Sequence, residues 1–425
     1  MILEKGNKKL INAWATYDWA NSAYNLVITA TIFPIYYKSV TPDVVKVFGW
    51  EYKNTSLYDY AIAFAYMLIA SIIPLLSGIA DYGGSKKKFM QFFCYLGSIS
   101  CLLMFFFTSE NYLFGLLLAI IACVGYSGSL VFYNAYLPEI AKPVQQDGVS
   151  ARGFAYGYIG SSVLLILNLV MIQNPHWFGI SDQTMATRIS FITVGVWWFA
   201  FAQIPFYHLP NNIYNKKTEG RYLLNGYKEL RKVWRDIKAN KNLTKYLTAF
   251  FVYSMGVQTI MLVATHFGSE EIKMESGQLI ATILIIQFLA ILGAYLFSMA
   301  SKKISNISAL KGATIIWSLI CLATYFFVYT PMHFFFAAGA VGLVMGGIQS
   351  LSRSTYSKML PETEDPSSYF SFYDIAEKFS IVCGMLTFGF ITEFTSTLRT
   401  PIIALISFFI IGFLLLLRVP KINAD

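Results

Sequence analysis

Long apolar stretches follow one another along the whole chain, and they limit its possible folds more than any other feature. A helix needs about 20 consecutive apolar residues to cross the hydrocarbon core of a bilayer. Only 13% of the 425 residues are charged, about half of the ~25% that is typical of soluble domains. The sequence therefore predicts an all-α polytopic membrane protein without a separate soluble catalytic domain. We place its twelve spans at residues 14–37, 58–80, 89–108, 111–136, 154–173, 188–208, 246–268, 276–300, 309–329, 331–351, 369–392 and 399–418.

The positively charged residues predict the orientation of these spans. Lysine and arginine accumulate on the cytoplasmic side of membrane proteins. With an inner N-terminus, 26 of the 32 lysines and arginines lie in inner segments, and we expect both termini in the cytoplasm and a multi-pass location in the cell (inner) membrane. We therefore attribute the net charge of +9 to membrane topology. Anionic lipid headgroups are the expected partner of these basic residues, and nucleic-acid binding is not expected. The outer segments hold the other six: Lys38, Lys46, Lys53, Arg188, Lys273 and Arg399.

A polar segment, residues 209–245, separates two halves of six spans each, 1–208 and 246–425. Its second part carries apolar residues at intervals of three and four with Lys and Arg opposite, which is typical of a basic amphipathic helix at a membrane surface. We expect this helix to connect the halves on the cytoplasmic face, and a regulatory or partner-binding role is the alternative. Its apolar positions are Leu224, Tyr227, Leu230, Val233 or Trp234, and Ile237.

A repeated motif links the two halves. The pattern Y-x-x-x-L-P-E occurs at residues 133–139, where the fourth span ends, and again at residues 356–362, just after the tenth span. Transporters are commonly built from two related halves. The repeat therefore supports a parallel duplication of six spans.

The segment between the second and third spans, SGIADYGGSKKK at residues 77–88, resembles a loop of the major facilitator superfamily. That loop runs Gly, three residues, Asp, two residues, Gly and then basic residues. The resemblance implies two pseudo-symmetric six-helix bundles and a gating role for the loop, whereas the alternative is a capped helix end with topology-setting lysines. Ser77, Tyr82 and Ser85 depart from the pattern. The matching residues are Asp81, Gly84, Lys86 and Lys87.

Two further stretches narrow the resemblance: WATYDWANSAY at 14–24 and SARGFAYGYIGS at 150–161. Together with ADYGG at 80–84, they are similar to the autophagy-related vacuolar amino-acid effluxer family and its bacterial relatives, often called the unknown major facilitator family. This resemblance implies a secondary transporter and amino-acid export. Composition and spacing alone predict only a transporter.

Polar residues form a stripe on the first span, where Asp18, Asn21 or Ser22, Asn25 and Thr29 recur at helical intervals. An ionisable group inside a span costs about 3 kcal/mol and marks a pathway, a proton site or a buried pair. We expect Asp18 to bind a proton, a cation or the amino group of a substrate. The alternative is a carboxylate about four residues inside the cytoplasmic end that reaches interfacial water or caps a helix. Asn21 and Asn25 are expected to hydrogen-bond a polar solute.

Other polar residues within the spans are candidates for the substrate site. The alternative for each is an interhelical hydrogen bond. Those on the first, fourth, seventh and tenth spans are favoured because these helices line the cavity in the superfamily that the chain resembles. The candidates are Tyr24, Tyr133, Asn134, Gln258 and Gln349, with Gln287 retained more weakly.

The eleventh span begins with three charges. Asp374 and Lys378 are four residues apart and are predicted to pair along the helix. Glu377 has no partner in this predicted pair. We expect it either to carry the coupling proton or to form an ion pair with Arg353, with Lys358 or with the lysines after Asp81. Such an ion pair would lock an outward-open state. The alternative is a solvated helix entrance with ordinary charges. The predicted gating group is Asp81, Gly84, Lys86, Lys87, Arg353, Asp374 and Lys378.

The sequence lacks motifs that are typical of enzyme active sites: it has no G-x-S-x-G, no phosphate-binding loop and no zinc-type histidine spacing. We therefore predict a monomeric secondary transporter of a small polar solute that works by alternating access, with no cofactor and no metal. Proton coupling through Asp18 or Glu377 is our hypothesis for its energy source. The alternatives are another solute class, such as sugar or peptide, and a membrane sensor or scaffold without transport.

Overall fold

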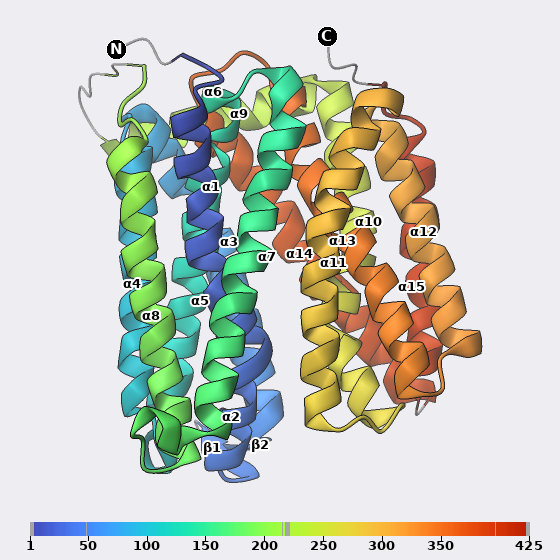
Figure 1. Ribbon diagram of the computed structural model, residues 1–425. Coiled ribbons are helices and arrows are strands. Elements are labelled where there is room, and N and C mark those ends of the chain that lie inside the picture. The colour runs from blue at the N-terminus through green and yellow to red at the C-terminus, as the bar shows by residue number, and fades with distance from the viewer. Residues whose placement is uncertain (1–3, 48, 215, 217–221, 396, 422–425) are drawn as a thin grey trace.

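The computed structural model of the chain describes residues 4–47, 49–214, 216, 222–395 and 397–421. Within these ranges, eleven helical stretches are long and apolar enough to cross a membrane, and they dominate the structure (Figure 1). Their principal helices are α3 (Asn54–Tyr82), α4 (Lys86–Leu103), α5 (Tyr112–Asn134), α7 (Pro143–Gln173), α8 (Gln183–His208), α10 (Lys241–Glu270), α11 (Ser276–Ile304), α12 (Asn306–Phe327), α13 (Pro331–Met359), α14 (Pro366–Thr395) and α15 (Arg399–Leu416).

The predicted first span, 14–37, corresponds to three consecutive helical segments. These are α1 (Lys8–Ala23), the π-helix η1 (Tyr24–Ile32) and α2 (Phe33–Val40). Asn7 starts α1, because its side chain accepts hydrogen bonds from two backbone N–H groups of the first turn. A π-helix has a wider turn than an α-helix and often marks a functional site. It changes the phase of the side chains, so the predicted α-helical stripe does not continue unchanged beyond Ala23.

The short elements define the two ends of the molecule. The strands β1 (Val44–Val47) and β2 (Trp50–Lys53) form an antiparallel hairpin at one end, and α9 (Tyr222–Ala239) lies at the other (Figure 1). We call these ends the hairpin face and the α9 face. Helix α1 begins and α15 ends at the α9 face. The remaining short helices are α6 (Leu137–Ile140), η2 (Met104–Phe106), η3 (Ser109–Asn111) and η4 (Pro175–Phe178).

The long helices form two bundles that stand side by side, α1 to α8 and α10 to α15 (Figure 1). Helix α7 of the first bundle contacts α11 and α13 of the second, and α3 contacts α14. Helix α9 packs on α3 and also contacts α10 and α14. The connection between the bundles is thus itself part of the packing.

Two helices extend well beyond their predicted spans at the α9 face. Helix α7 begins at Pro143 rather than at residue 154, and α13 ends at Met359 rather than at residue 351. Hydropathy falls where polar side chains begin. A hydropathy criterion therefore starts the span of α7 too late and ends the span of α13 too early. The added turns carry polar residues that bond across the two bundles, as described below.

The face of α9 that packs on the protein shares only part of the predicted apolar stripe. Gly226, Val233 and Ile237 are buried, whereas Leu224 and Tyr227 are 52% and 56% exposed. A Cβ atom on Gly226 would lie 2.6 Å from the Ile79 side chain, so this glycine lets α9 approach α3 closely. Close approach to α3 therefore turns α9 away from the predicted orientation.

Glycine also brings α7 against α1. A Cβ atom on Gly157 would lie 2.5 Å from the hydroxyl of Ser22, and one on Gly160 would lie 2.7 Å from the carbonyl oxygen of Trp19. Small residues permit this close backbone approach between membrane helices. The polar residues of α1 are thereby held at a fixed distance from α7.

We expect Gly157→Leu to lower the thermal unfolding midpoint of the purified protein, because the new side chain must displace α1. Overpacking of this kind typically costs about 1–3 kcal/mol. Gly389→Leu is the matched control, since this helical glycine has nothing within 4 Å of its Cβ position. Equal midpoints for the two variants, measured by fluorescence-detected melting in detergent, would contradict the packing role.

Candidate functional site

A central cavity of about 190 Å³ lies between the two bundles. Both bundles supply its wall, which combines aromatic rings with amides, hydroxyls and charges of both signs. Its volume is smaller than the ~300–1,000 Å³ of sites for drug-sized ligands and suits a small solute. The aromatic residues are Tyr66, Tyr126, Phe154, Tyr158, Phe250, Tyr253 and Tyr373. The polar and charged residues are Asp18, Ser22, Asn25, Asn134, Ser161, Ser254, Gln258, Gln287, Gln349, Ser352, Arg353, Glu377 and Lys378.

Arg353 of α13 reaches across from the second bundle into the first. Its Nε donates to Ser150 Oγ at 2.9 Å, and its Nη2 donates to the Ser150 carbonyl oxygen at 2.9 Å. Its Nη1 donates to Asp18 Oδ2 at 3.3 Å and to Asn134 Oδ1 at 3.2 Å. The guanidinium also lies 4.2 Å from the ring centre of Phe154. Every nitrogen of this buried cation is thus bonded to the first bundle.

Asp18 is buried rather than open to water. Helix α1 begins at Lys8, ten residues before Asp18, so the acid lies well inside the helix. The carboxylate accepts a 2.7 Å hydrogen bond from the Tyr133 hydroxyl and pairs with Arg353, and its side chain is 7% exposed. The Tyr133 ring stacks on Trp14 with ring centres 4.4 Å apart. Asp18 is therefore a buried, paired acid at the edge of the cavity.

A second buried acid connects the bundles in the opposite direction, from the first bundle to the second. Asp147 of α7 pairs with Lys358 Nζ at 2.7 Å, and the same oxygen accepts a 2.9 Å hydrogen bond from Ser301. Its other oxygen accepts a 2.8 Å hydrogen bond from Asn306. All three donors belong to the second bundle. Sequence reasoning missed Asp147, because it lies before the predicted start of its span.

Asp81, from the predicted gating loop, caps the first turn of α14. Its two carboxylate oxygens accept hydrogen bonds from the backbone N–H groups of Ser367 and Ser368, at 3.2 and 2.6 Å. A negative charge is favourable at a helix N-terminus. This contact also joins the two bundles at the α9 face.

The other members of that loop bond within its own bundle and the segment that follows it. Lys86 forms an ion pair with Glu139, and Lys87 donates to the carbonyl oxygen of Leu209 at 2.9 Å. Gly84 adopts a φ of +57°, which favours glycine. The described bonds of Lys86 and Lys87 thus stay within the first bundle and the segment after it, whereas Asp81 bonds to the second bundle.

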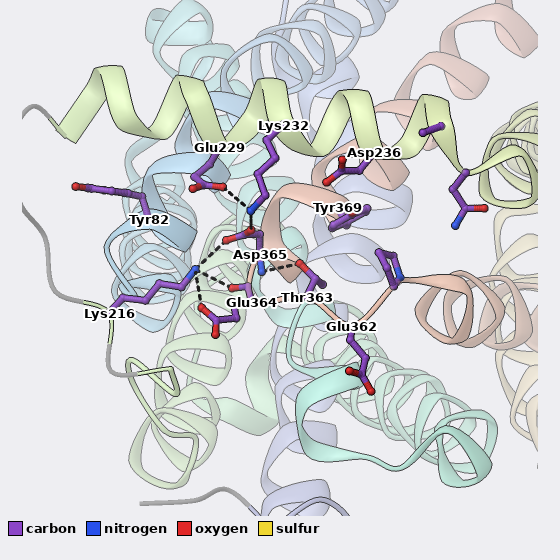
Figure 2. Close-up of a pocket in the computed structure, with 13 residues that line it drawn as sticks. Tyr82, Lys216, Glu229, Lys232, Asp236, Glu362, Thr363, Glu364, Asp365 and Tyr369 are labelled. Carbon is purple, nitrogen blue, oxygen red and sulfur yellow. Dashed lines mark hydrogen bonds and ion pairs between the residues drawn. The ribbon is translucent and has the colours of Figure 1, made fainter.

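A pair of lysines holds Asp365, which precedes α14, beneath α9 (Figure 2). Lys216 Nζ lies 2.8 Å from one carboxylate oxygen, and Lys232 Nζ of α9 lies 3.1 Å from the other. Burial alone would raise the pKa of Asp365, but the hydrogen bonds and charges of the two lysines outweigh it and lower the pKa below its ordinary value. We call this group of three residues the α9 clamp.

The charges of α14 confirm one prediction and contradict another. Lys378 pairs with Asp374 at 3.5 Å, as the four-residue spacing predicts, and its ammonium lies 5.3 Å from the ring centre of Tyr66. Glu377 accepts a 3.0 Å hydrogen bond from Gln258 and keeps 26% of its side chain exposed. The predicted bridge from Glu377 to the cations near the α9 face is wrong, because Arg353, Lys358 and Lys86 pair with other acids and Lys87 bonds to a backbone carbonyl. The observed pairs are Arg353 with Asp18, Lys358 with Asp147, and Lys86 with Glu139.

The predicted substrate-site residues fall into two groups. Asn25, Asn134, Gln258, Gln287 and Gln349 line the cavity, and Gln349 accepts a 2.6 Å hydrogen bond from Tyr158. Asn21, Tyr24 and Tyr133 are buried outside its lining.

Most of the aromatic wall was missed by sequence reasoning. With 28 tyrosines in the chain, the residue type alone does not distinguish a cavity position from a core position. Tyr158 could have been identified from the sequence, since it lies in the stretch 150–161 that resembles a known family.

The polar contacts between the bundles lie on one side of the molecule. Among the described residues, the hydrogen bonds and ion pairs that join the bundles lie at the level of the cavity or between it and the α9 face. The bundles are therefore held together at the α9 face in this conformation.

Comparisons with known proteins relate this architecture to transporters. The family model described as vacuole effluxer Atg22 like matches residues 6–424. YxiO of Bacillus subtilis, described as an uncharacterized MFS-type transporter, is 32% identical over 412 residues, which cover 96% of this chain and 94% of that protein. Autophagy-related protein 22 of Yarrowia lipolytica is 23% identical over 443 residues, covering 84% of this chain and 74% of that protein.

Solved structures show the same fold. FucP, a major facilitator superfamily transporter in the outward conformation, aligns with 97% of this chain and 99% of its own at a TM-score of 0.72 and 11% identity. A bacterial homologue of the iron transporter ferroportin aligns with 98% of this chain and 99% of its own at a TM-score of 0.65 and 8% identity. At these identities the likeness concerns the fold alone.

We expect Arg353→Gln to open the α9 face, because removing one partner of a buried ion pair costs about 3–5 kcal/mol. Spin labels at Lys88→Cys and Ile304→Cys, both exposed positions near that face, would report a longer distance between the bundles. Arg399→Gln is the control, since Arg399 pairs with Glu271 inside the second bundle. An unchanged distance distribution in Arg353→Gln would contradict this role.

The lowered pKa of Asp365 predicts how the α9 clamp responds to pH. A lowered pKa means stabilisation that is complete above the ordinary value of 3.8 and is lost as the pH falls below it. The difference in melting midpoint between the wild type and Asp365→Asn should therefore be constant from about pH 5 to pH 8. Glu364→Gln, at an exposed side chain, serves as the control and should change little. A difference that varies across this range would assign the clamp to another titrating group.

Proposed function

The chain belongs to the family described as vacuole effluxer Atg22 like, within the major facilitator superfamily of transporters, and from that premise we propose that it exports a small amino-acid-like solute by alternating access. It is a multi-pass membrane protein, and we place it in the cell (inner) membrane. The observation that carries the proposal is the central cavity, which both bundles line and which polar bonds between the bundles close toward the α9 face.

The lining supports a solute that carries a positive charge together with hydrogen-bonding groups. Glu377 is partly exposed; its carboxylate accepts a hydrogen bond from the Gln258 amide and lies 3.8 Å from the Lys378 ammonium. The carboxylate is therefore available to an ammonium group, which the aromatic wall also favours through cation–π contact. Amide side chains such as Asn25 both donate and accept hydrogen bonds and would bind the polar remainder.

The topology follows from the same proposal. We infer that α1, η1 and α2 together make the first of twelve crossings and that the α9 face, where α1 begins and α15 ends, is cytoplasmic. The predicted concentration of lysine and arginine in the inner segments supports this orientation. The conformation described here would then be closed to the cytoplasm. Alternating access would require the bonds of Arg353, Asp147 and Asp81 to break together.

A proton can break the first of these bonds. Protonation of Asp18 would remove the negative charge that pairs with Arg353, and it would leave the guanidinium with neutral acceptors from Ser150 and Asn134. The buried cation would then be less well compensated, and the closed α9 face less stable. Proton binding at Asp18 is thereby coupled to opening. Glu377 is the second candidate for the coupling proton.

Transport by reconstituted vesicles tests the proposal. We expect saturable uptake of a radiolabelled amino acid that increases with an imposed pH gradient. Asp18→Asn should retain solute exchange without a gradient and lose the response to pH, whereas Glu377→Gln should weaken solute binding, here by about tenfold for a charge-assisted hydrogen bond. Glu110→Gln, at an exposed position, is the charge-matched control.

Two outcomes would contradict the proposal. An unchanged pH response in Asp18→Asn would remove Asp18 from coupling. No flux of amino acids, peptides, sugars or ions in vesicles of correctly folded protein would favour a membrane sensor.

A further inference from the structure

One face of α14 is turned toward lipid. Phe379, Leu386, Phe390 and Phe394 are 53%, 69%, 63% and 73% exposed. Their spacings of seven, four and four residues place them on one side of the helix. In a membrane protein, such an exposed apolar stripe contacts the acyl chains.

Helix α9 continues this surface at the α9 face. Phe372 lies seven residues before Phe379 and so belongs to the same side of α14. The indole of Trp234 stacks on the Phe372 ring with centres 5.2 Å apart and an angle of 26° between the planes. Trp234 is 43% exposed. Its position at the end of a lipid-facing stripe is that of an interfacial tryptophan.

Trp234 belongs to one flank of α9, which we call the outer flank: Tyr227, Arg231, Trp234 and Lys238. Successive spacings of four, three and four residues align these side chains along the helix. All four are exposed, and the Lys238 ammonium lies 4.6 Å from the centre of the Trp234 ring. No carboxylate among the described residues lies within ion-pair distance of Arg231 or Lys238. The outer flank thus presents two uncompensated cations beside two aromatic rings.

Two other sides of α9 contact the rest of the protein. Gly226, Val233 and Ile237 face the protein, and Lys232 points toward the α9 clamp, where Figure 2 shows it beside Asp365. Helix α9 therefore has a protein-facing side, a clamp side, an exposed side with Leu224, Lys228 and Arg235 opposite the protein, and the outer flank. Only the outer flank combines exposure, positive charge and continuity with the lipid-facing stripe of α14.

We propose that the outer flank of α9 is a binding site for anionic phospholipid headgroups, in which Arg231 and Lys238 pair with the phosphate and Tyr227 and Trp234 lie at the level of the interface. Both the charge of the flank and its place beside the acyl-chain region fit this ligand. The same helix holds Asp365 through Lys232, so a bound lipid fixes α9 where the clamp is formed. Anionic lipid therefore favours the conformation that is closed at the α9 face.

The site is tested by the variant Arg231→Gln/Lys238→Gln in full-length protein. Binding of phosphatidylglycerol and of phosphatidylcholine is measured by lipid titration with native mass spectrometry. At about 1 kcal/mol for each basic residue near a membrane surface, the double variant should lose about 30-fold in affinity for phosphatidylglycerol. Its affinity for phosphatidylcholine should not change. An unchanged melting midpoint in phosphatidylcholine nanodiscs shows that the variant is folded.

The matched control is Lys302→Gln/Lys303→Gln, which removes the same charge from exposed positions at the end of α11. It should retain most of the affinity for phosphatidylglycerol. An equal loss in this control would show diffuse attraction to the basic surface and overturn the site. Competition by inorganic phosphate at millimolar concentration would identify a soluble anion as the ligand and would also overturn it.

The conformational consequence is measured separately. Spin labels at Lys88→Cys and Ile304→Cys should give a shorter and narrower distance distribution in phosphatidylglycerol nanodiscs than in phosphatidylcholine nanodiscs. The difference should disappear in Arg231→Gln/Lys238→Gln. A lipid effect that persists in this variant would overturn the role of the outer flank. These measurements are independent of solute transport, so they distinguish a failure of this site from a failure of the proposed transport function.

Discussion

The insertion of Arg353 into the opposite bundle is the contact on which the closed α9 face depends. A buried cation is stable only where hydrogen bonds and charge compensate its lost hydration. Arg353 finds this compensation entirely in the first bundle, from Asp18, Asn134 and both polar groups of Ser150. The bundles cannot separate at this point without exposing the guanidinium to other partners. The same residue lines the cavity, so the site and the closure share one side chain.

The remaining contacts are of a kind that would allow the proposed closure to reverse. Asp147 extends from the first bundle to donors of the second, and Asp81 binds the first turn of α14. These are polar bonds that water can replace when the bundles part, whereas a large apolar contact would lose its burial. Lys232 of α9 adds a clamp on Asp365 from outside. The connection between the bundles therefore takes part in the closure.

The local features of the chain were largely readable in advance. Apolar runs predicted where the helices lie, and the four-residue spacing of Asp374 and Lys378 predicted their pair. Asp147 was missed because hydropathy placed the start of its span at residue 154, although the helix begins at Pro143. Asn21 and Asn25 looked equivalent as residue types. The packing of α1, which continues into a π-helix at Tyr24, buries Asn21 and exposes Asn25 to the cavity.

The sequence by itself determined the class of protein, the helices and the residue types that carry polar chemistry, because hydropathy and side-chain spacing act over a few residues at a time. Only the tertiary structure decided which of these residues are partners. Asp18 and Arg353 are 335 positions apart, and no local pattern relates them. Their pairing depends on how two bundles pack, which follows from many close contacts between helices. The tertiary structure also decided which flank of α9 faces the protein, since Gly226 lets that helix approach α3 and Trp234 is left exposed against Phe372 of α14.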